Sequence, residues 1–424
     1  MPLLTLIKQP RTREESHLDL ELLLDLTLKH FYDSGALDLH QLTDRMALTG
    51  NLMQGILDLL RNDSRLEVLA AKENSTGVRY QLTDSGRAEA QKAYLRSGYI
   101  GRAPITIEHY RQLVEAQSVF NNSISKAELK DVFADIVLEE HLYDQLGPAL
   151  HSGRAIMVYG PAGSGKTFIC KRLAHCLGGP IHLPYAIAVG REIIQFFDPL
   201  IHTPVYKASE KTSFQFEART DQRLILCERP VAISGGELTM DRLELRYDPV
   251  TRLNQAPIQL KANNGIYIVD DLGRQRMPPI DLLNRWIVPM EAHLDYLILG
   301  TGQHFPVPFD TVLVFSTNLH PLELADEAFL RRLAYKIQFS TILKVQFTQI
   351  WKNVCKDRKI TVEEGVLEWV FDSYAQTKRS FLPCQPRDLI DIGLDMAAFN
   401  NNKGVLSKAN IMLAWNTYFI DLQL

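Results

Sequence analysis

The stretch of sequence that decides the fold reads Gly160-Pro161-Ala162-Gly163-Ser164-Gly165-Lys166-Thr167. It matches the pattern G-x-x-x-x-G-K-[ST] in full, with an apolar, strand-like run at 155–159 before it and a helical pattern at 168–177 after it. Glycines let backbone N–H groups turn inward around phosphate oxygens, and the N-terminus of the following helix favours an anion. The stretch therefore predicts a phosphate-binding loop between a buried strand and a helix.

Two side chains at the end of this loop carry specific chemistry. Lys166 can reach the β- and γ-phosphates of a nucleotide, and the Thr167 hydroxyl can ligate Mg²⁺. We therefore expect the loop to bind ATP, with Mg²⁺ as the accompanying ion.

A second apolar run, at 265–269, ends in Asp270 and Asp271. The carboxyl ends of parallel strands meet at one edge of a sheet, so these carboxylates are expected beside the phosphate loop. Asp270 would hold Mg²⁺ through water, and Asp271 would orient or deprotonate the attacking water. Without the loop, the same run reads equally well as a strand followed by an acidic turn.

Composition narrows the class of protein. The chain has 424 residues, of which 46% are hydrophobic and 23% charged, and this is typical of a globular protein with two to four domains. Its net charge is −4. The five cysteines are scattered, and this favours a reducing cytoplasm over a disulfide framework. We found no signal-peptide pattern and no apolar stretch long enough to span a membrane, so we expect a cytoplasmic protein without a membrane partner.

The pattern of apolar residues suggests four segments. Residues 1–96 form a small N-terminal domain and 97–125 a linker, whereas 126–338 alternate apolar runs with helical stretches, as in a parallel α/β sheet. A single helix is expected over 126–150. Residues 339–424 read as a helical lid, with helices expected at 342–355, 362–375, 386–399 and 406–419.

The N-terminal segment has the element order of a winged helix–turn–helix domain. Helices are expected at 18–32, 39–46 and 51–61, followed by strands at 65–71 and 78–82 and a last helix to residue 94. A polar, glycine-containing turn joins the two strands, so we expect them to form the wing.

From residue 129 to residue 424 the sequence resembles the AAA+ ATPases. Besides the phosphate loop and the two acids, three stretches carry the resemblance: Thr311–Asn318 looks like the sensor-1 strand, Asp326–Leu333 like the arginine-finger segment and Gln385–Leu389 like sensor 2 at the start of a lid helix. Their order and spacing on one chain make the set more specific than any member.

The resemblance implies a role for each of four polar side chains. Asn318 would help to place the attacking water, and Arg387 would point at the γ-phosphate. Arg332 is the favoured candidate for the finger that reaches the nucleotide of a neighbouring subunit, and Arg331 is the second candidate. This implies a homo-oligomeric ring, expected to be a hexamer. The alternatives are a strand-end turn for Asn318, a solvated basic helix end for the two finger candidates, and a surface salt bridge for Arg387.

The sequence departs from the family pattern at the second acid. The family commonly has Glu there, whereas this chain has Asp271, which is one methylene shorter. Helicase-loader-like members of the superfamily also show an Ile-Asp-Asp-Leu-Gly type of sequence, similar to 269–273 here. The departure therefore implies slow turnover rather than an inactive enzyme.

Residues 294–309 read as a β-hairpin with a Gly-Thr-Gly turn, and they resemble the pre-sensor-1 hairpin of MoxR-like ATPases. Such hairpins often project into the ring pore and touch a substrate. The resemblance implies remodelling of a protein partner, and the plainer alternative is an ordinary surface hairpin.

The distribution of charged residues indicates whether the N-terminal domain binds DNA or protein. Residues 1–100 hold 12 Lys and Arg against 14 Asp and Glu, and the helix at 51–61 that would enter a DNA groove offers only Arg61 and Asp58. In the wing only Lys72 and Arg79 are basic. Since DNA binding needs several phosphate contacts, protein docking is favoured. A DNA-associated loader or regulator and an ATP-controlled scaffold with little turnover remain the alternatives.

Overall fold

The structure is a computed structural model that describes residues 2–69, 78–121, 124–205, 220–399 and 405–420. The chain forms two compact units, which are described separately. The first comprises Met1–Asn122, Leu177–Tyr267 and Gln275–Leu313, and the second comprises Ser123–Cys176, Ile268–Arg274 and Val314–Leu424.

The first unit begins with a helical subdomain built on α3. Its elements are α1 (Leu3–Leu6), α2 (Arg13–Ser16), α3 (Leu20–Ser34), β1 (Leu37–Asp38), α4 (Leu39–Met46), α5 (Gly50–Asn62), β2 (Leu66–Leu69), β3 (Arg79–Leu82) and α6 (Asp84–Arg96). The Asp19 carboxylate accepts backbone N–H groups at the start of α3, and Gly35 ends the helix at φ 74°. The strands form a small sheet in the order β1-β3-β2.

The helices and the two longer strands expected in this segment are therefore present, together with the short strand β1. The predicted wing turn, including Lys72, lies outside the described residues, so the winged-helix class stays a prediction.

Residues 97–125, which we expected to be a linker, contain regular structure. They include β4 (Ile105–Thr106), α7 (Ile107–Ala116) and the 3₁₀ turn η1 (Val119–Asn121), and β4 pairs in parallel with β7 (Ala186–Val189). The side chains of Tyr110 and Leu113 on α7 are each only 1% exposed. Glycines and a proline before this helix suggested a linker, but its own apolar spacing gives it a face to bury.

The first unit contains two further sheets. One has five strands in the order β11-β12-β8-β7-β4, with β8 (Glu192–Gln195), β11 (Arg246–Asp248) and β12 (Leu253–Gln255), and another pairs β6 (Ile181–Pro184) with β9 (Leu224–Cys227). The unit's other helical segments are η3 (Met240–Leu243), α11 (Ile258–Lys261), α12 (Pro279–Arg285) and α13 (Ile287–Ala292).

The predicted hairpin at 294–309 is confirmed. It consists of β14 (Leu294–Ile298) and β15 (His304–Pro308), which pair antiparallel. Side chains alternate along each strand: Leu297 and Phe305 are buried, whereas Tyr296 and Ile298 are exposed.

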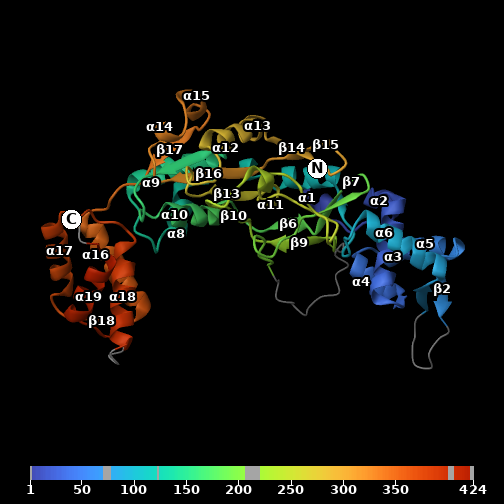
Figure 1. Ribbon diagram of the computed structural model, residues 1–424, viewed down its shortest axis with the longest axis horizontal. Coiled ribbons are helices and arrows are strands. Elements are labelled where there is room, and N and C mark those ends of the chain that lie inside the picture. The colour runs from blue at the N-terminus through green and yellow to red at the C-terminus, as the bar shows by residue number, and fades with distance from the viewer. Residues whose placement is uncertain (1, 70–77, 122–123, 206–219, 400–404, 421–424) are drawn as a thin grey trace. The chain divides into compact units, whose positions relative to one another are not determined.

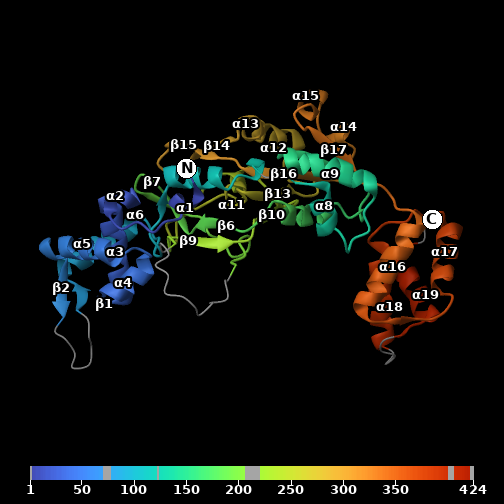
Figure 2. The same ribbon diagram turned by 180° about the vertical axis from the view of Figure 1, so that it is seen from behind.

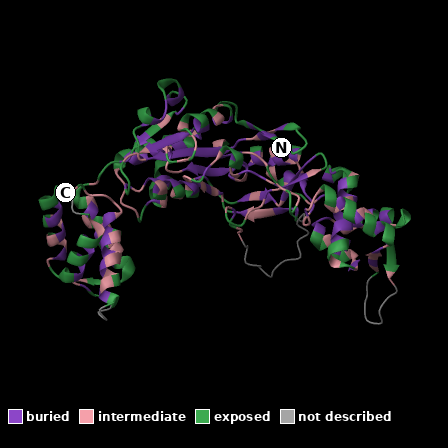
Figure 3. Cartoon of the chain, viewed as in Figure 1, coloured by how far each residue is buried: buried purple, intermediate pink, exposed green. Residues whose placement is uncertain are grey.

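The sheet that carries the phosphate loop has the order β10-β13-β16-β5-β17. Its strands are β5 (Ile156–Tyr159), β10 (Val231–Ser234), β13 (Gly265–Val269), β16 (Thr311–Thr317) and β17 (Tyr335–Gln338). β5 pairs in parallel with β16 on one side and with β17 on the other. Figure 1 labels β13, β16 and β17 of this sheet. β13 and β16 are buried along their full lengths, as Figure 3 shows, which is typical of strands covered on both faces of a sheet.

The second unit contains all of the lid. The helices α16 (Lys344–Arg358), α17 (Val366–Thr377), α18 (Gln385–Phe399) and α19 (Lys408–Tyr418) confirm the four expected there, and the short strands β18 (Thr361–Val362) and β19 (Val405–Leu406) pair beside them. Phe347, Trp351 and Tyr374 are buried in their common core. Figures 1 and 2 show these helices grouped together.

The helix expected over 126–150 is interrupted. The structure has α8 (Lys126–Val132) and α9 (Glu140–Ser152), separated by a seven-residue connection at 133–139. The unit's other helical segments are α10 (Lys166–Arg172), η2 (Leu173–Cys176), α14 (Pro321–Leu324) and α15 (Glu327–Leu330). Among the described residues, no helix combines the length and the apolar character that crossing a membrane requires.

Candidate nucleotide site

Glycines give the loop between β5 and α10 its shape. Gly160, Gly163 and Gly165 have φ angles of 141°, 82° and 86°, which side-chain-bearing residues rarely adopt. Gly165 stands at the N-cap of α10, so the backbone turns directly from the loop into the helix. A Cβ atom at Gly160 would lie 2.0 Å from the carbonyl oxygen of Phe339. The loop therefore needs glycine at this position for both conformation and space.

Lys166 is held inside the loop. Its side-chain nitrogen donates hydrogen bonds to the carbonyl oxygens of Gly160 at 2.8 Å and Pro161 at 2.9 Å, and to Oδ1 of Asn318 at 2.8 Å. Burial lowers the pKa of Lys166, and the charges of Asp270 and Asp271 oppose that shift. A cation in this position is poised to exchange these neutral acceptors for phosphate oxygens.

Thr167 and Asp270 meet directly. The Thr167 hydroxyl donates to Oδ2 of Asp270 at 2.8 Å, and the backbone N–H of Asp271 donates to Oδ1 of Asp270 at 3.0 Å. A hydroxyl and a carboxylate are hard oxygen ligands of the kind that Mg²⁺ prefers, and these two converge beside the phosphate loop. This donor set fits the expected magnesium ion.

Asn318 connects the loop lysine to the second acid. Its side-chain nitrogen donates to Oδ1 of Asp271 at 3.2 Å, while its oxygen accepts from Lys166. β16 lies between β13 and β5, so the residue that follows β16 stands between the residues that follow its two neighbours. Asp271 has a positive φ of 50°, an uncommon conformation for a residue with a side chain and one that often marks functional sites.

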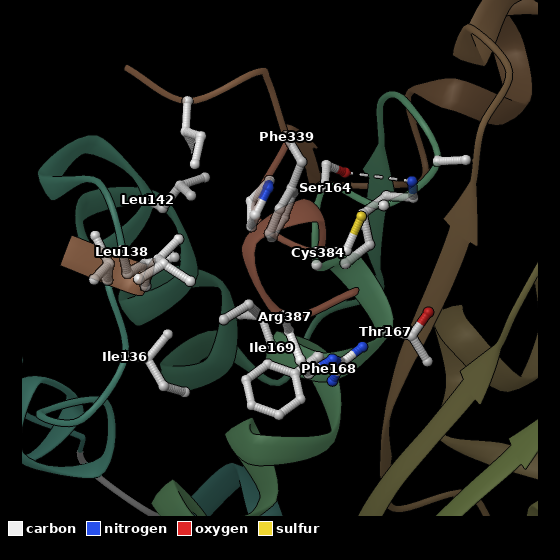
Figure 4. A pocket seen from close by; sticks show the side chains of 18 of the residues that line it. Ile136, Leu138, Leu142, Ser164, Thr167, Phe168, Ile169, Phe339, Cys384 and Arg387 are labelled. Atoms are coloured by element: carbon white, nitrogen blue, oxygen red, sulfur yellow. Dashed lines mark hydrogen bonds between the residues drawn. The ribbon is translucent and has the colours of Figure 1, made fainter. Parts of the chain in front are cut away.

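These groups line one end of a pocket of about 680 Å³. At the other end the lining is largely apolar. Ile136, Val137, Leu138 and Leu142 form this end, from the connection between α8 and α9 and from the start of α9. Further apolar lining of the pocket comes from Phe339 and Ile342 on the strand-to-lid passage and from Ile350 and Val354 on α16. Figure 4 shows Ile136, Leu138 and Leu142 on the side of the pocket opposite Thr167.

The sequence did not reveal this apolar end. The connection at 135–139 was read as the middle of a helix, although its β-branched pair Ile136-Val137 weakens a helical pattern. The face of α16 has ordinary helical spacing, which any core-packed helix also shows. No local signal separates apolar residues that line a pocket from those that fill a core.

The lid reaches the phosphate loop through Cys384. Its backbone N–H donates to the carbonyl oxygen of Gly163 at 3.3 Å, and its sulfur would lie 2.5 Å from a Cβ at Gly163. Burial raises the pKa of the Cys384 thiol. Arg387, three residues further along the chain, lines the same pocket. Its Nε atom lies 3.6 Å from Oδ1 of Asp388. Its side chain is 58% exposed.

The structure thus brings together most of the side chains expected at the site. The pocket is lined by 162–167, Asp270, Asp271, Asn318 and Arg387, with Gly160 and Pro161 joined to it through Lys166. Arg331 and Arg332 are placed differently. They follow α15, are exposed and do not line the pocket, and Arg332 donates to the carbonyl oxygen of Ala328 at 3.3 Å.

Comparison with protein families gives one match, to a "Domain of unknown function (DUF8689)", over residues 344–417. This range holds the four lid helices, except for Tyr418 at the end of α19. Among curated proteins, no sequence matches the chain.

Solved structures similar to the chain include NtrX from Brucella abortus, with 10% identity and a TM-score of 0.40 over 79% of this chain and 61% of that one. NtrX in complex with ADP is similar with 13% identity and a TM-score of 0.39, over 77% and 65% of the two chains. A RuvB mutant from Thermotoga maritima shows 13% identity and a TM-score of 0.37, over 67% and 71%. The chain thus spans less than two thirds of the length of either NtrX structure.

Replacing Gly160 by alanine should damage the loop. The new Cβ would meet the Phe339 carbonyl and would sit at a φ that alanine adopts poorly, so we expect a loss of more than about 1 kcal/mol in the free energy of unfolding, together with weaker ATP binding. Gly179 has no atom within 4 Å of such a Cβ, and Gly179→Ala should change stability by less than about 0.5 kcal/mol. Denaturant unfolding of both variants tests this, and equal losses would contradict it.

Proposed function

We propose that this chain is an AAA+ ATPase that couples ATP hydrolysis to the remodelling of a protein partner. One observation carries the proposal: Asn318 bridges the loop lysine and Asp271, beside the paired Thr167 and Asp270. A cation, oxygen ligands and a carboxylate base are the groups that phosphoryl transfer to water requires, and all belong to a single pocket.

In this proposal each side chain has one task. The loop amides and Lys166 would bind the phosphates, and Thr167 with Asp270 would hold Mg²⁺, which when bound neutralises phosphate charge. Asp271 would orient the attacking water and accept its proton, and Asn318 would keep that carboxylate in place. Arg387 would approach the γ-phosphate from the lid.

The proposal also includes a homo-oligomeric ring, with a hexamer as its most natural form. Arg331 and Arg332 are exposed and stand apart from the pocket of their own chain, as a finger supplied to a neighbouring subunit would. A guanidinium delivered in this way stabilises charge in the transition state, so hydrolysis would depend on assembly.

The hairpin β14–β15 is our candidate for contact with the partner, as in MoxR-like ATPases. It presents Tyr296 and Ile298 on its exposed face, and Leu297 and Phe305 anchor the other face. An aromatic and an aliphatic side chain in water are suited to gripping a polypeptide. The winged-helix domain would dock proteins, and the whole assembly would work in the cytoplasm.

A DNA-associated ATPase is the alternative that the N-terminal domain raises. On α5, Arg61 lies 3.7 Å from Asp58, so the one base of that helix already has an acidic neighbour. If the alternative held, the chain would bind duplex DNA with a strong salt dependence, and deletion of residues 1–95 would abolish it. We expect no binding above the level of that deletion in a low-salt titration with labelled duplex, and salt-dependent binding lost on deletion would establish the alternative.

Hydrolysis should depend on the base and on the finger. We expect Asp271→Asn to lower the rate of phosphate release by about 10²-fold or more, and Arg332→Ala by about 10³-fold, because each removes a group that acts in the transition state. Asp372→Asn and Arg154→Ala change exposed residues of the same unit that do not line the pocket, and they should keep wild-type rates. Measuring phosphate release at saturating ATP tests this.

Three outcomes of that assay would count against parts of the proposal. Unchanged rates in Asp271→Asn would remove the assigned base. A loss in Arg331→Ala with none in Arg332→Ala would move the finger by one residue. ATP-dependent assembly with negligible turnover in the wild-type chain would favour the nucleotide-controlled scaffold.

A further inference from the structure

Helix α16 contributes both polar and apolar side chains to the lining of the pocket. Ile350, Asn353, Val354 and Asp357 are spaced by three, one and three residues, and all four line the pocket. This spacing places them on one face of the helix. Two are aliphatic and two are polar, so the same face offers both an apolar surface and hydrogen-bonding groups.

Asn353 and Asp357 have hydrogen-bonding capacity to spare. The Asn353 side-chain oxygen accepts from Nε2 of Gln349 at 2.9 Å, which leaves the Asn353 nitrogen as a donor. Within the described part of the chain, no hydrogen bond or ion pair occupies the Asp357 carboxylate, which is exposed at the rim. One donor and one acceptor group thus stand a single helical turn apart.

Two other acidic side chains of the pocket lining already have partners. Asp135 pairs with Arg172 at 2.6 Å, and Glu139 accepts from Gln346 at 3.3 Å. Ile136, Leu138 and Leu142, which line the same pocket, are apolar. A flat, apolar ring with a polar edge fits such surroundings, whereas a sugar or a phosphate would leave its polar groups unpaired there.

We propose that Asn353 and Asp357 read the edge of an adenine base. The Asn353 nitrogen donates to a ring nitrogen, and the Asp357 carboxylate accepts from the exocyclic 6-amino group. This inference rests on the proposed ATPase function and adds the residues that determine nucleotide specificity. Guanine bound in the same orientation would set its 6-oxygen against the Asp357 carboxylate without a proton between them, so this orientation disfavours GTP.

Binding competition can test this assignment. Unlabelled ATP, GTP and purine riboside 5′-triphosphate, which lacks the 6-amino group, would each displace a ribose-labelled fluorescent ATP analogue from the full chain. We expect the wild-type chain to bind ATP about 10-fold more tightly than the other two, the usual effect of one charge-assisted hydrogen bond.

Two variants separate the roles of the edge residues. In Asp357→Ala, ATP and purine riboside triphosphate should bind within about 2-fold of each other, because the acceptor for the amino group is gone. In Asn353→Ala both nucleotides should weaken together, since both keep the ring nitrogens. Asp372→Ala, which removes an exposed carboxylate of α17 that does not line the pocket, should keep the wild-type preference for ATP.

The outcomes distinguish this inference from the function on which it rests. If the wild-type chain binds the three nucleotides equally, binds GTP most tightly, or keeps its preference in Asp357→Ala, the assignment of the edge is wrong while nucleotide binding stands. If the labelled analogue does not bind, or binds equally well to Lys166→Ala, the proposed ATPase function itself is overturned, and this inference with it.

Discussion

The side-by-side arrangement of β13, β16 and β5 is the constraint on which the rest of the site depends. Strands that end at one edge of a sheet deliver whatever follows them to the same place. Here the phosphate loop follows β5, Asn318 follows β16, and the two acids follow β13. The amide of Asn318 then joins Lys166 to Asp271 through two hydrogen bonds. Residues more than a hundred positions apart in the sequence thereby join one hydrogen-bonded cluster.

The lid contacts the phosphate loop where two loop glycines let other segments come close to the backbone. Phe339, which follows β17, packs closely against Gly160. Cys384, which precedes α18, packs closely against Gly163 and donates a hydrogen bond to its carbonyl oxygen. Both contacts use the space that a missing side chain leaves. The base of the lid also carries Arg387, which lines the pocket.

The sequence predicted those parts of the site that short, continuous motifs encode. The loop and the acid pair each combine a motif with a strand, so their positions follow from one strand direction and one sheet edge. Asn318 was predicted from the resemblance of 311–318 to the sensor-1 strand of the AAA+ ATPases. The apolar end was not, because it depends on where the helix at 126–150 breaks and on which face of α16 turns inward. Both are decided by packing between segments distant in sequence.

The segment at 97–125 also shows that packing between distant segments is not predictable from local sequence. Its glycines and proline are typical of a linker, yet Tyr110 and Leu113 of α7 are buried in the first unit. Turn-forming residues mark where a chain bends, and they say little about whether the next few residues find a surface to cover. Apolar spacing within 107–116 was the better guide.

Calorimetric titration of the full chain with ATP in the presence of Mg²⁺ tests the central claim most directly. The account predicts one saturable site per chain, and binding that weakens at least about 10-fold in Lys166→Ala, where the cation that meets the phosphates is removed. An affinity for ATP that is unchanged in that variant, or no binding to the wild-type chain, would contradict it.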